Sequence, residues 1–137
     1  MRAIVVPRLG GPEVLTLRDL PDPVCGPDQV VVRIKYAGVT FGDVYVREGT
    51  YRGGKPLLES DPPLPIGGEG AGTVTAVGAD VTHVAVGDTV VYCETIGSYA
   101  ESLAVPGWRV VKVPEGIDLR DAAALYSHGM TAHYLAH

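Results

Sequence analysis

The sequence predicts a mainly β domain in which short strands form a partly open barrel. Its 137 residues include 18 glycines and 11 prolines, set among short valine-rich runs. Glycine supplies positive φ angles and proline fixes φ, so this composition favours tight turns between strands. A chain of this length fits one domain and buries roughly two thirds of its unfolded surface. Many short antiparallel strands are typical of a closed or partly closed barrel.

The turn residues divide the chain into a series of expected strands. Residues 1–6 predict an opening strand and residues 15–20 its partner, with a turn at Gly10-Gly11-Pro12 between them. Residues 29–39 alternate between apolar and charged side chains, which predicts a long strand that ends at Thr40. Later strands are expected at residues 70–77, around Val90 and Val91, at 99–105 and at 110–113.

Two segments between the early strands are expected to be less regular. Residues 43–48 predict one helical turn, with Asp43 capping the free backbone N–H groups at its start. Residues 53–65 contain four prolines, which lack the N–H group that regular hydrogen bonding needs. This stretch is therefore predicted to be an irregular excursion.

The amino-acid composition changes near the end of the chain, where helix-forming residues replace the valine-rich runs. Asp118 suits the N-cap of a helix over residues 119–126. A second helix is expected to start near Ser127 or Gly129 and to continue toward the last residue. The sequence therefore predicts a helical segment after the β domain.

Charge and hydropathy exclude several classes of partner. The net charge of −5, with eleven scattered basic residues, disfavours nucleic acid, whose phosphates call for clustered lysine and arginine. No run reaches the roughly eighteen apolar residues that span a bilayer, and the first residues do not resemble a secretory signal. The expected location is the cytoplasm, with no membrane partner.

The cysteines give no sign of a disulfide framework or a metal site. Cys25 and Cys93 are the only two, and a single pair is weak evidence for an oxidising compartment. Their spacing from the histidines matches no recognised metal-binding pattern. We expect two free thiols and no bound metal.

Two segments, residues 37–51 and 65–74, resemble the catalytic domain of medium-chain dehydrogenases/reductases. Within that superfamily they are similar to the zinc-free quinone oxidoreductases related to zeta-crystallin. Zinc-dependent members place a cysteine near Thr40 and a histidine near Gly68, ahead of the glutamate matched by Glu69, and this chain has neither ligand. Matching motifs elsewhere are Met1-Arg2-Ala3-Ile4, Gly87-Asp88-Thr89-Val90, Gly97-Ser98-Tyr99-Ala100-Glu101 and Ala122-Ala123-Ala124.

The resemblance implies a GroES-like catalytic domain over residues 1–121. Residues 122–137 would begin a helical connection to a dinucleotide-binding domain, and no segment of this chain fits the G-x-G-x-x-G turn of such a domain. The implied activity of the complete protein is hydride transfer from NADPH to a quinone or an α,β-unsaturated carbonyl. This chain would be the substrate-side part, inactive or nearly so by itself, with apolar residues exposed over 123–137 and able to self-associate.

The resemblance also implies candidate site residues. Tyr45 and Tyr51 match tyrosines that line the family's active-site cleft, and a phenol of pKa about 10 can donate a hydrogen bond at neutral pH. Thr40 lies where zinc-free members carry an asparagine that reaches cofactor and substrate, although a hydroxyl is shorter and has one donor. Thr131 matches a residue near the nicotinamide amide, or else its hydroxyl bonds within its own helix.

Other polar residues have simpler interpretations. Asp43 is expected mainly to cap the helical turn, and Glu69 to pair with a nearby arginine. His128 and His133 fit a surface or an interdomain face better than acid–base chemistry, since neither has a visible partner in the sequence.

Two other functions are compatible with the same fold. The barrel also resembles co-chaperonin subunits, which suggests a non-enzymatic interaction module. A regulatory fragment that occupies the domain interface of a full-length reductase is the other alternative.

Overall fold

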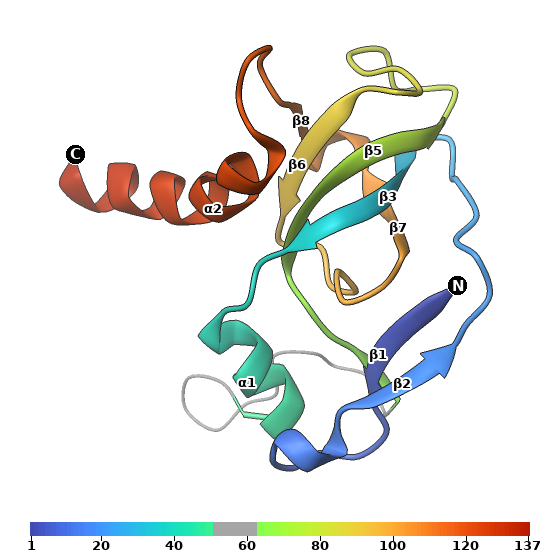
Figure 1. Ribbon diagram of the computed structural model, residues 1–137, viewed down its shortest axis with the longest axis vertical. Coiled ribbons are helices and arrows are strands. Elements are labelled where there is room, and N and C mark those ends of the chain that lie inside the picture. The colour runs from blue at the N-terminus through green and yellow to red at the C-terminus, as the bar shows by residue number, and fades with distance from the viewer. Residues whose placement is uncertain (51–62) are drawn as a thin grey trace.

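The structure, a computed structural model, describes residues 1–50 and 63–137 (Figure 1). Within these ranges the chain forms one three-stranded sheet, in the order β2-β1-β4, and one five-stranded sheet, in the order β7-β3-β5-β6-β8. The strands are β1 (Arg2–Val6), β2 (Thr16–Asp19), β3 (Gln29–Ala37), β4 (Leu64–Pro65), β5 (Glu69–Val77), β6 (Thr89–Cys93), β7 (Ser102–Pro106) and β8 (Val110–Lys112). The described strands do not close into a full barrel, so the expected partly open β architecture is confirmed.

β-Branched side chains fill most of the core of the five-stranded sheet. One cluster of buried residues draws on β3, β5, β6, β7 and β8, and most of its members are valines. β-Branched residues fit a pleated, half-buried surface, which explains their concentration here. The members include Val30, Val32, Val74, Val90, Tyr92, Val105 and Val110.

An irregularity in β3 sends two alternate residues to different faces of this sheet. Ile34 packs against the interior valine cluster, whereas Tyr36 packs against the cluster beneath the C-terminal helix. Strict two-residue periodicity would place both on one face. The register between β3 and β5 shifts between Ile34 and Tyr36, which accounts for the change of face.

The three-stranded sheet packs with the first helix, α1 (Phe41–Glu48), around a second cluster that includes Val6, Val46 and Ile66. Helix α1 begins two residues before the expected helical turn. Its N-cap is Thr40, and Asp43 is the third helical residue and caps the N–H of Thr40. The prediction of a capping Asp43 was right about the function of the side chain but wrong about where the helix starts.

The C-terminal segment is one continuous helix, α2 (Leu119–Ala136), and the expectation of two helices was wrong. Asp118 caps it, because its carboxylate accepts from the N–H groups of Arg120 and Asp121. Gly129 does not interrupt it, since glycine lowers helix stability without removing a hydrogen-bond donor as proline does. The boundary expected after residue 121 falls inside this helix.

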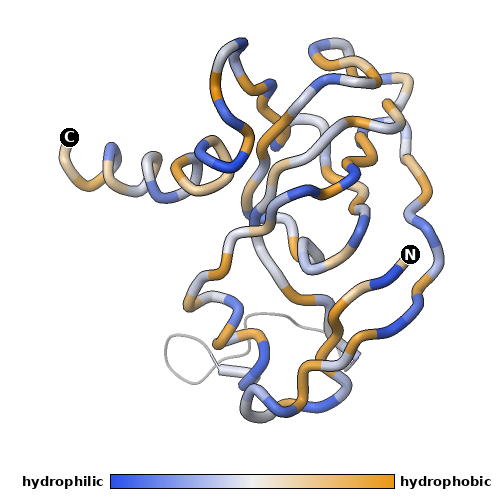
Figure 2. Tube along the Cα trace, in the orientation of Figure 1, coloured by the Kyte–Doolittle hydropathy of each residue, from blue (hydrophilic) through white to orange (hydrophobic). Residues whose placement is uncertain are grey.

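Only the first turns of α2 lie on the sheet, where Ala123 packs with Ala71 and Val91. The rest projects away from the sheet in Figure 1, and Figure 2 shows hydrophobic and hydrophilic residues alternating along it. Leu125, Tyr134 and Leu135 are all more than half exposed. The expected exposure of apolar residues beyond Ala123 is confirmed.

Most other expectations agree with the structure to within a few residues. β7 starts at Ser102 rather than at Tyr99, which instead lies between the two sheets. Of the expected irregular excursion, residues 53–62 lie outside the described part, and Leu64–Pro65 form β4. Cys25 and Cys93 are both free thiols, as expected. In the described ranges, neither helix is both long and apolar enough to cross a membrane.

Candidate functional site

A buried carboxylate at the start of α1 gathers three hydrogen-bond donors on one oxygen. Asp43 is only 6% exposed. Its Oδ2 accepts from the backbone N–H of Thr40 at 2.8 Å and from the Tyr99 hydroxyl at 2.9 Å. The Thr40 hydroxyl lies 3.4 Å from the same oxygen. We call Thr40, Asp43 and Tyr99 the Asp43 cluster.

Tyr99 is held between the two sheets by its backbone. Its N–H donates to the carbonyl of Ile66 at 3.1 Å, and its own carbonyl accepts from Ile4 at 2.8 Å. Gly67 has a φ of +90°, and a Cβ at this position would lie 2.5 Å from Cδ1 of the Tyr99 ring. Glycine at position 67 is therefore needed both for its backbone conformation and for the place of the ring.

Glu69, next to this cluster, is buried without an ion-pair partner among the described residues. It is 5% exposed, and its Oε1 has no hydrogen-bond partner within the described part of the chain. The carboxylate lies over Gly38, where any Cβ would collide with it. None of the ion pairs in residues 1–50 and 63–137 includes Glu69, so the expected arginine partner is not found there.

No described residue fills the space beside Gly68. A Cβ added at Gly68 would meet no atom of the described chain within 4 Å. This is where the zinc-dependent relatives carry a histidine, and no packed group from residues 1–50 or 63–137 takes its place. Among the described residues, no three His, Cys, Asp or Glu side chains lie together in a way that could hold a metal ion.

Burial and nearby carboxylates raise the pKa values of Tyr99 and Cys93. Burial, the hydrogen bond to Asp43 and the charges of Asp43 and Glu69 all raise the pKa of Tyr99 above its usual value. Burial and the charges of Glu94 and Glu69 likewise raise the pKa of the Cys93 thiol. The site thus presents neutral hydroxyl and thiol groups rather than phenolate or thiolate.

The residues predicted from the sequence divide into three groups. Thr40 belongs to the Asp43 cluster, and Tyr45 lies on α1 with 40% of its surface exposed. Tyr51 lies outside the described residues. The Thr131 hydroxyl donates to the carbonyl of Ser127 at 3.0 Å, within α2, so the structure has the helix bond that the sequence offered as one of two alternatives.

Sequence reasoning missed Tyr99 as a site residue. Tyr99 lies in the motif over residues 97–101, where the sequence predicts the start of a strand over residues 99–105. Nothing in the local pattern indicated that its hydroxyl reaches a carboxylate 56 residues earlier in the chain. That contact depends on how the two sheets meet.

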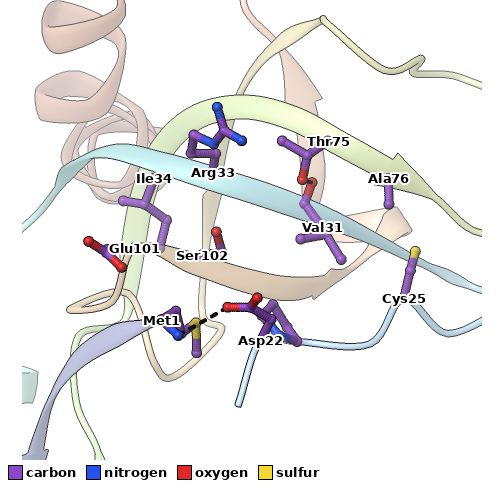
Figure 3. A pocket seen from close by; sticks show the side chains of 11 residues that line it. Met1, Asp22, Cys25, Val31, Arg33, Ile34, Thr75, Ala76, Glu101 and Ser102 are labelled. Carbon is purple, nitrogen blue, oxygen red and sulfur yellow. Dashed lines mark hydrogen bonds and ion pairs between the residues drawn. The ribbon is translucent and has the colours of Figure 1, made fainter. Parts of the chain in front are cut away.

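A separate cleft of the described chain, with a volume of about 650 Å³, lies elsewhere (Figure 3). Three charged groups in its lining, those of Met1, Asp22 and Glu101, are already paired, and Arg33 forms no ion pair among the described residues. The Met1 amino group lies 3.0 Å from the Asp22 carboxylate, and Arg2 binds Glu101 through two guanidinium nitrogens at 2.9 and 2.7 Å. Glu69, whose buried Oε1 has no hydrogen-bond partner within the described residues, lies close enough to Tyr99 to affect its pKa. We therefore place the candidate site at the Asp43 cluster and the adjoining Glu69.

Three similar proteins indicate what this arrangement belongs to. A quinone oxidoreductase of Pseudomonas aeruginosa is 42% identical over 127 residues, which are 92% of this chain and 37% of that protein. A 2-haloacrylate reductase of Burkholderia sp is 37% identical over 98% of this chain and 40% of its own length. The crystal structure of Escherichia coli quinone oxidoreductase complexed with NADPH matches with a TM-score of 0.90 and 31% identity, over 98% of this chain and 40% of that chain.

The chain thus spans about 40% of the length of the relatives it matches. The family model described as the alcohol dehydrogenase GroES-like domain matches residues 26–115, which include β3, α1, β5 and all three residues of the Asp43 cluster. On this match, the chain belongs to the family of alcohol dehydrogenase GroES-like domains.

Proposed function

We propose that this chain is the substrate-side domain of an NADPH-dependent reductase that acts on quinones or other α,β-unsaturated carbonyls. In this proposal residues 1–121 form that domain, and residues 122–137 begin the connection to a dinucleotide-binding domain. Support comes from the quinone oxidoreductases and the haloacrylate reductase that the chain resembles over more than nine tenths of its length. The observation that carries the proposal is the Asp43 cluster, in which Asp43 accepts from the Tyr99 hydroxyl while the Thr40 hydroxyl is only weakly bonded.

The chemistry of such a reduction calls for hydroxyl donors. When a hydride adds to a quinone or an enone, negative charge develops on the acceptor oxygen, and donors aimed at that oxygen stabilise the transition state. The Thr40 hydroxyl is held only weakly, at 3.4 Å from Asp43, and Tyr45 exposes 40% of its surface. We assign these two side chains, with Tyr51, to orienting the acceptor and to passing it a proton.

NADPH supplies the hydride when it is bound. The proposed place for its ring is beside Gly68, where a Cβ would meet no atom of the described residues within 4 Å and where the buried Glu69 follows in the chain. Thr40 and Tyr45 are the proposed cofactor contacts on this side of the site. Thr131 is a further proposed contact, as an acceptor, because its hydroxyl proton is already donated to Ser127.

The proposed reaction needs no metal ion. Thr40 and Gly68 stand where the zinc-dependent relatives have cysteine and histidine, and a threonine hydroxyl is a poor zinc ligand beside a thiolate or an imidazole. Charge on the acceptor oxygen is then stabilised by hydroxyl donors in place of a Lewis acid.

The test uses the complete protein that carries this chain. NADPH oxidation is followed with a quinone, an enone and a saturated ketone, for the wild type and for Tyr45→Phe. Trp108→Phe serves as the control, because Trp108 is 74% exposed and lies outside both the candidate site and α2. We expect turnover with the quinone or the enone, a loss in Tyr45→Phe of about tenfold or more, as for a removed donor, and no change in Trp108→Phe. Absence of NADPH oxidation with all three acceptors would refute the proposed function.

A further inference from the structure

The arrangement at Asp43 has more donors than one oxygen can hold well. A carboxylate oxygen offers about two lone-pair sites. The Thr40 N–H at 2.8 Å and the Tyr99 hydroxyl at 2.9 Å have ordinary hydrogen-bond lengths and take both sites of Oδ2. The third donor, the Thr40 hydroxyl, is left at 3.4 Å, well beyond the usual 2.5–3.0 Å of an O–H···O bond.

This crowding decides what the Thr40 hydroxyl can do for a ligand. A threonine hydroxyl has a single proton. If that proton were donated to Asp43 in a short bond, only lone pairs would remain to face a ligand. Because Tyr99 occupies the second site on Oδ2, the proton of Thr40 stays weakly held and can be given to an acceptor oxygen.

We propose that Tyr99 is a positioning residue that keeps the Thr40 hydroxyl available as a hydrogen-bond donor to the carbonyl oxygen of a bound acceptor. Only the identity of that acceptor depends on the proposed function. The competition between Tyr99 and the Thr40 hydroxyl for one oxygen is a property of the described residues.

Tyr99 is well suited to this role because it has little freedom to move. Backbone hydrogen bonds to Ile66 and Ile4 fix its main chain, and the ring packs against the cluster that includes Val46 of α1. Its hydroxyl also stays protonated well above neutral pH, since burial and the Asp43 carboxylate both raise its pKa. Because the backbone and the ring of Tyr99 are both held in place, its hydroxyl occupies its site on Asp43 Oδ2 continuously.

The structural test is the Thr40 Oγ1 to Asp43 Oδ2 distance in a crystal structure of the Tyr99→Phe protein. Phenylalanine keeps the packed ring and removes only the hydroxyl. We expect the distance to fall from 3.4 Å in the present structure to about 2.7 Å, the usual O–H···O length. Trp108→Phe is the control and should leave it unchanged. A distance that stays near its original value in a folded Tyr99→Phe protein would overturn the inference.

The kinetic test is a double-mutant cycle in the complete protein, with Thr40→Val and Tyr99→Phe and a quinone as the acceptor. If Tyr99 acts through the Thr40 hydroxyl, Tyr99→Phe lowers kcat/KM by about tenfold in the wild-type background and has little effect in the Thr40→Val background. Thr40→Ser, which retains a hydroxyl, should keep the sensitivity to Tyr99→Phe. An equal loss in both backgrounds would mean a merely structural role and would overturn the inference.

The two tests also separate this inference from the proposed function. If the distance closes in Tyr99→Phe but the wild type reduces no carbonyl acceptor, the proposed function fails and the role of Tyr99 in directing the Thr40 hydroxyl stands. If the wild type reduces quinones but the cycle shows no coupling, the function stands and this inference fails.

Discussion

The hydroxyl of Tyr99 donates a 2.9 Å hydrogen bond to the buried carboxylate of Asp43, and this bond joins the segment before β7 to the start of α1. The backbone of Tyr99 is in turn bonded to Ile4 in β1, so the same residue contacts both α1 and the three-stranded sheet. The position of α1, and with it of Thr40 and Tyr45, thus depends on a contact between distant parts of the chain.

Replacing Asp43 by alanine should destabilise the fold. The change leaves the Tyr99 hydroxyl and the Thr40 N–H without their acceptor in a buried place, which costs about 1–3 kcal/mol for each group that water cannot reach. Thermal unfolding followed by circular dichroism measures the loss. Glu115→Ala, at an exposed position, is the control, and an equal stability of the two variants would contradict this view of Asp43.

Gly67 and Gly68 should respond in opposite ways to alanine, although they are neighbours. At Gly67 the φ of +90° is unfavourable for alanine, and a Cβ would lie 2.5 Å from the Tyr99 ring. We expect Gly67→Ala to cost about 1–3 kcal/mol from the backbone alone. Gly68→Ala, whose Cβ would meet no atom of the described residues within 4 Å, should change stability much less. Denaturant titration of both variants gives the comparison, and similar losses would argue against the described turn.

The stability of the native state should fall at alkaline pH, and Tyr99 should contribute to this fall. Its pKa is raised in the folded state, so the folded chain keeps the proton that the unfolded chain releases near pH 10. The contribution of Tyr99 is therefore complete below about pH 10 and is lost progressively as the pH rises further.

The measurement is the free energy of unfolding between neutral pH and pH values above that of free tyrosine. Tyr99→Phe should show a shallower decline than the wild type, while some decline remains because burial also raises the pKa of Tyr92 to about 12. Equal slopes in the two proteins would show that the Tyr99 hydroxyl is not protected by the fold.

Gly129→Ala should stabilise the protein. Gly129 lies inside α2, and a Cβ there would meet nothing within 4 Å. Alanine in the middle of an exposed helix is more stable than glycine by about 0.5–1 kcal/mol. A stabilised variant with higher helix content by circular dichroism would support one continuous helix. Destabilisation would instead indicate a break between two helices at this position.

The sequence predicted those parts of the fold that depend on local patterns. Alternating side chains located β3, and the capping residue Asp118 located the start of α2 to the residue. The expectation of a new helix near Ser127 or Gly129 was wrong, since a helix without proline can continue through both residues. Local patterns therefore gave the elements but not every boundary.

The candidate site was predicted only in part, for a physical reason. Thr40 and Tyr45 lie in a contiguous segment with a recognisable motif, so the sequence alone pointed to them. The contact between Asp43 and Tyr99, and the absence of a described ion-pair partner for Glu69, result from the meeting of two sheets. The periodicity within a single segment does not predict which distant residues will be in contact.

The most direct test of the proposed metal-independent reduction is the rate of NADPH oxidation by the complete protein with a quinone, before and after treatment with a strong chelator. We predict that the rate is measurable and unchanged by the chelator, because hydroxyl donors at Thr40 and Tyr45 stabilise the charge on the acceptor oxygen. A rate that disappears on chelation and returns with zinc would contradict this prediction.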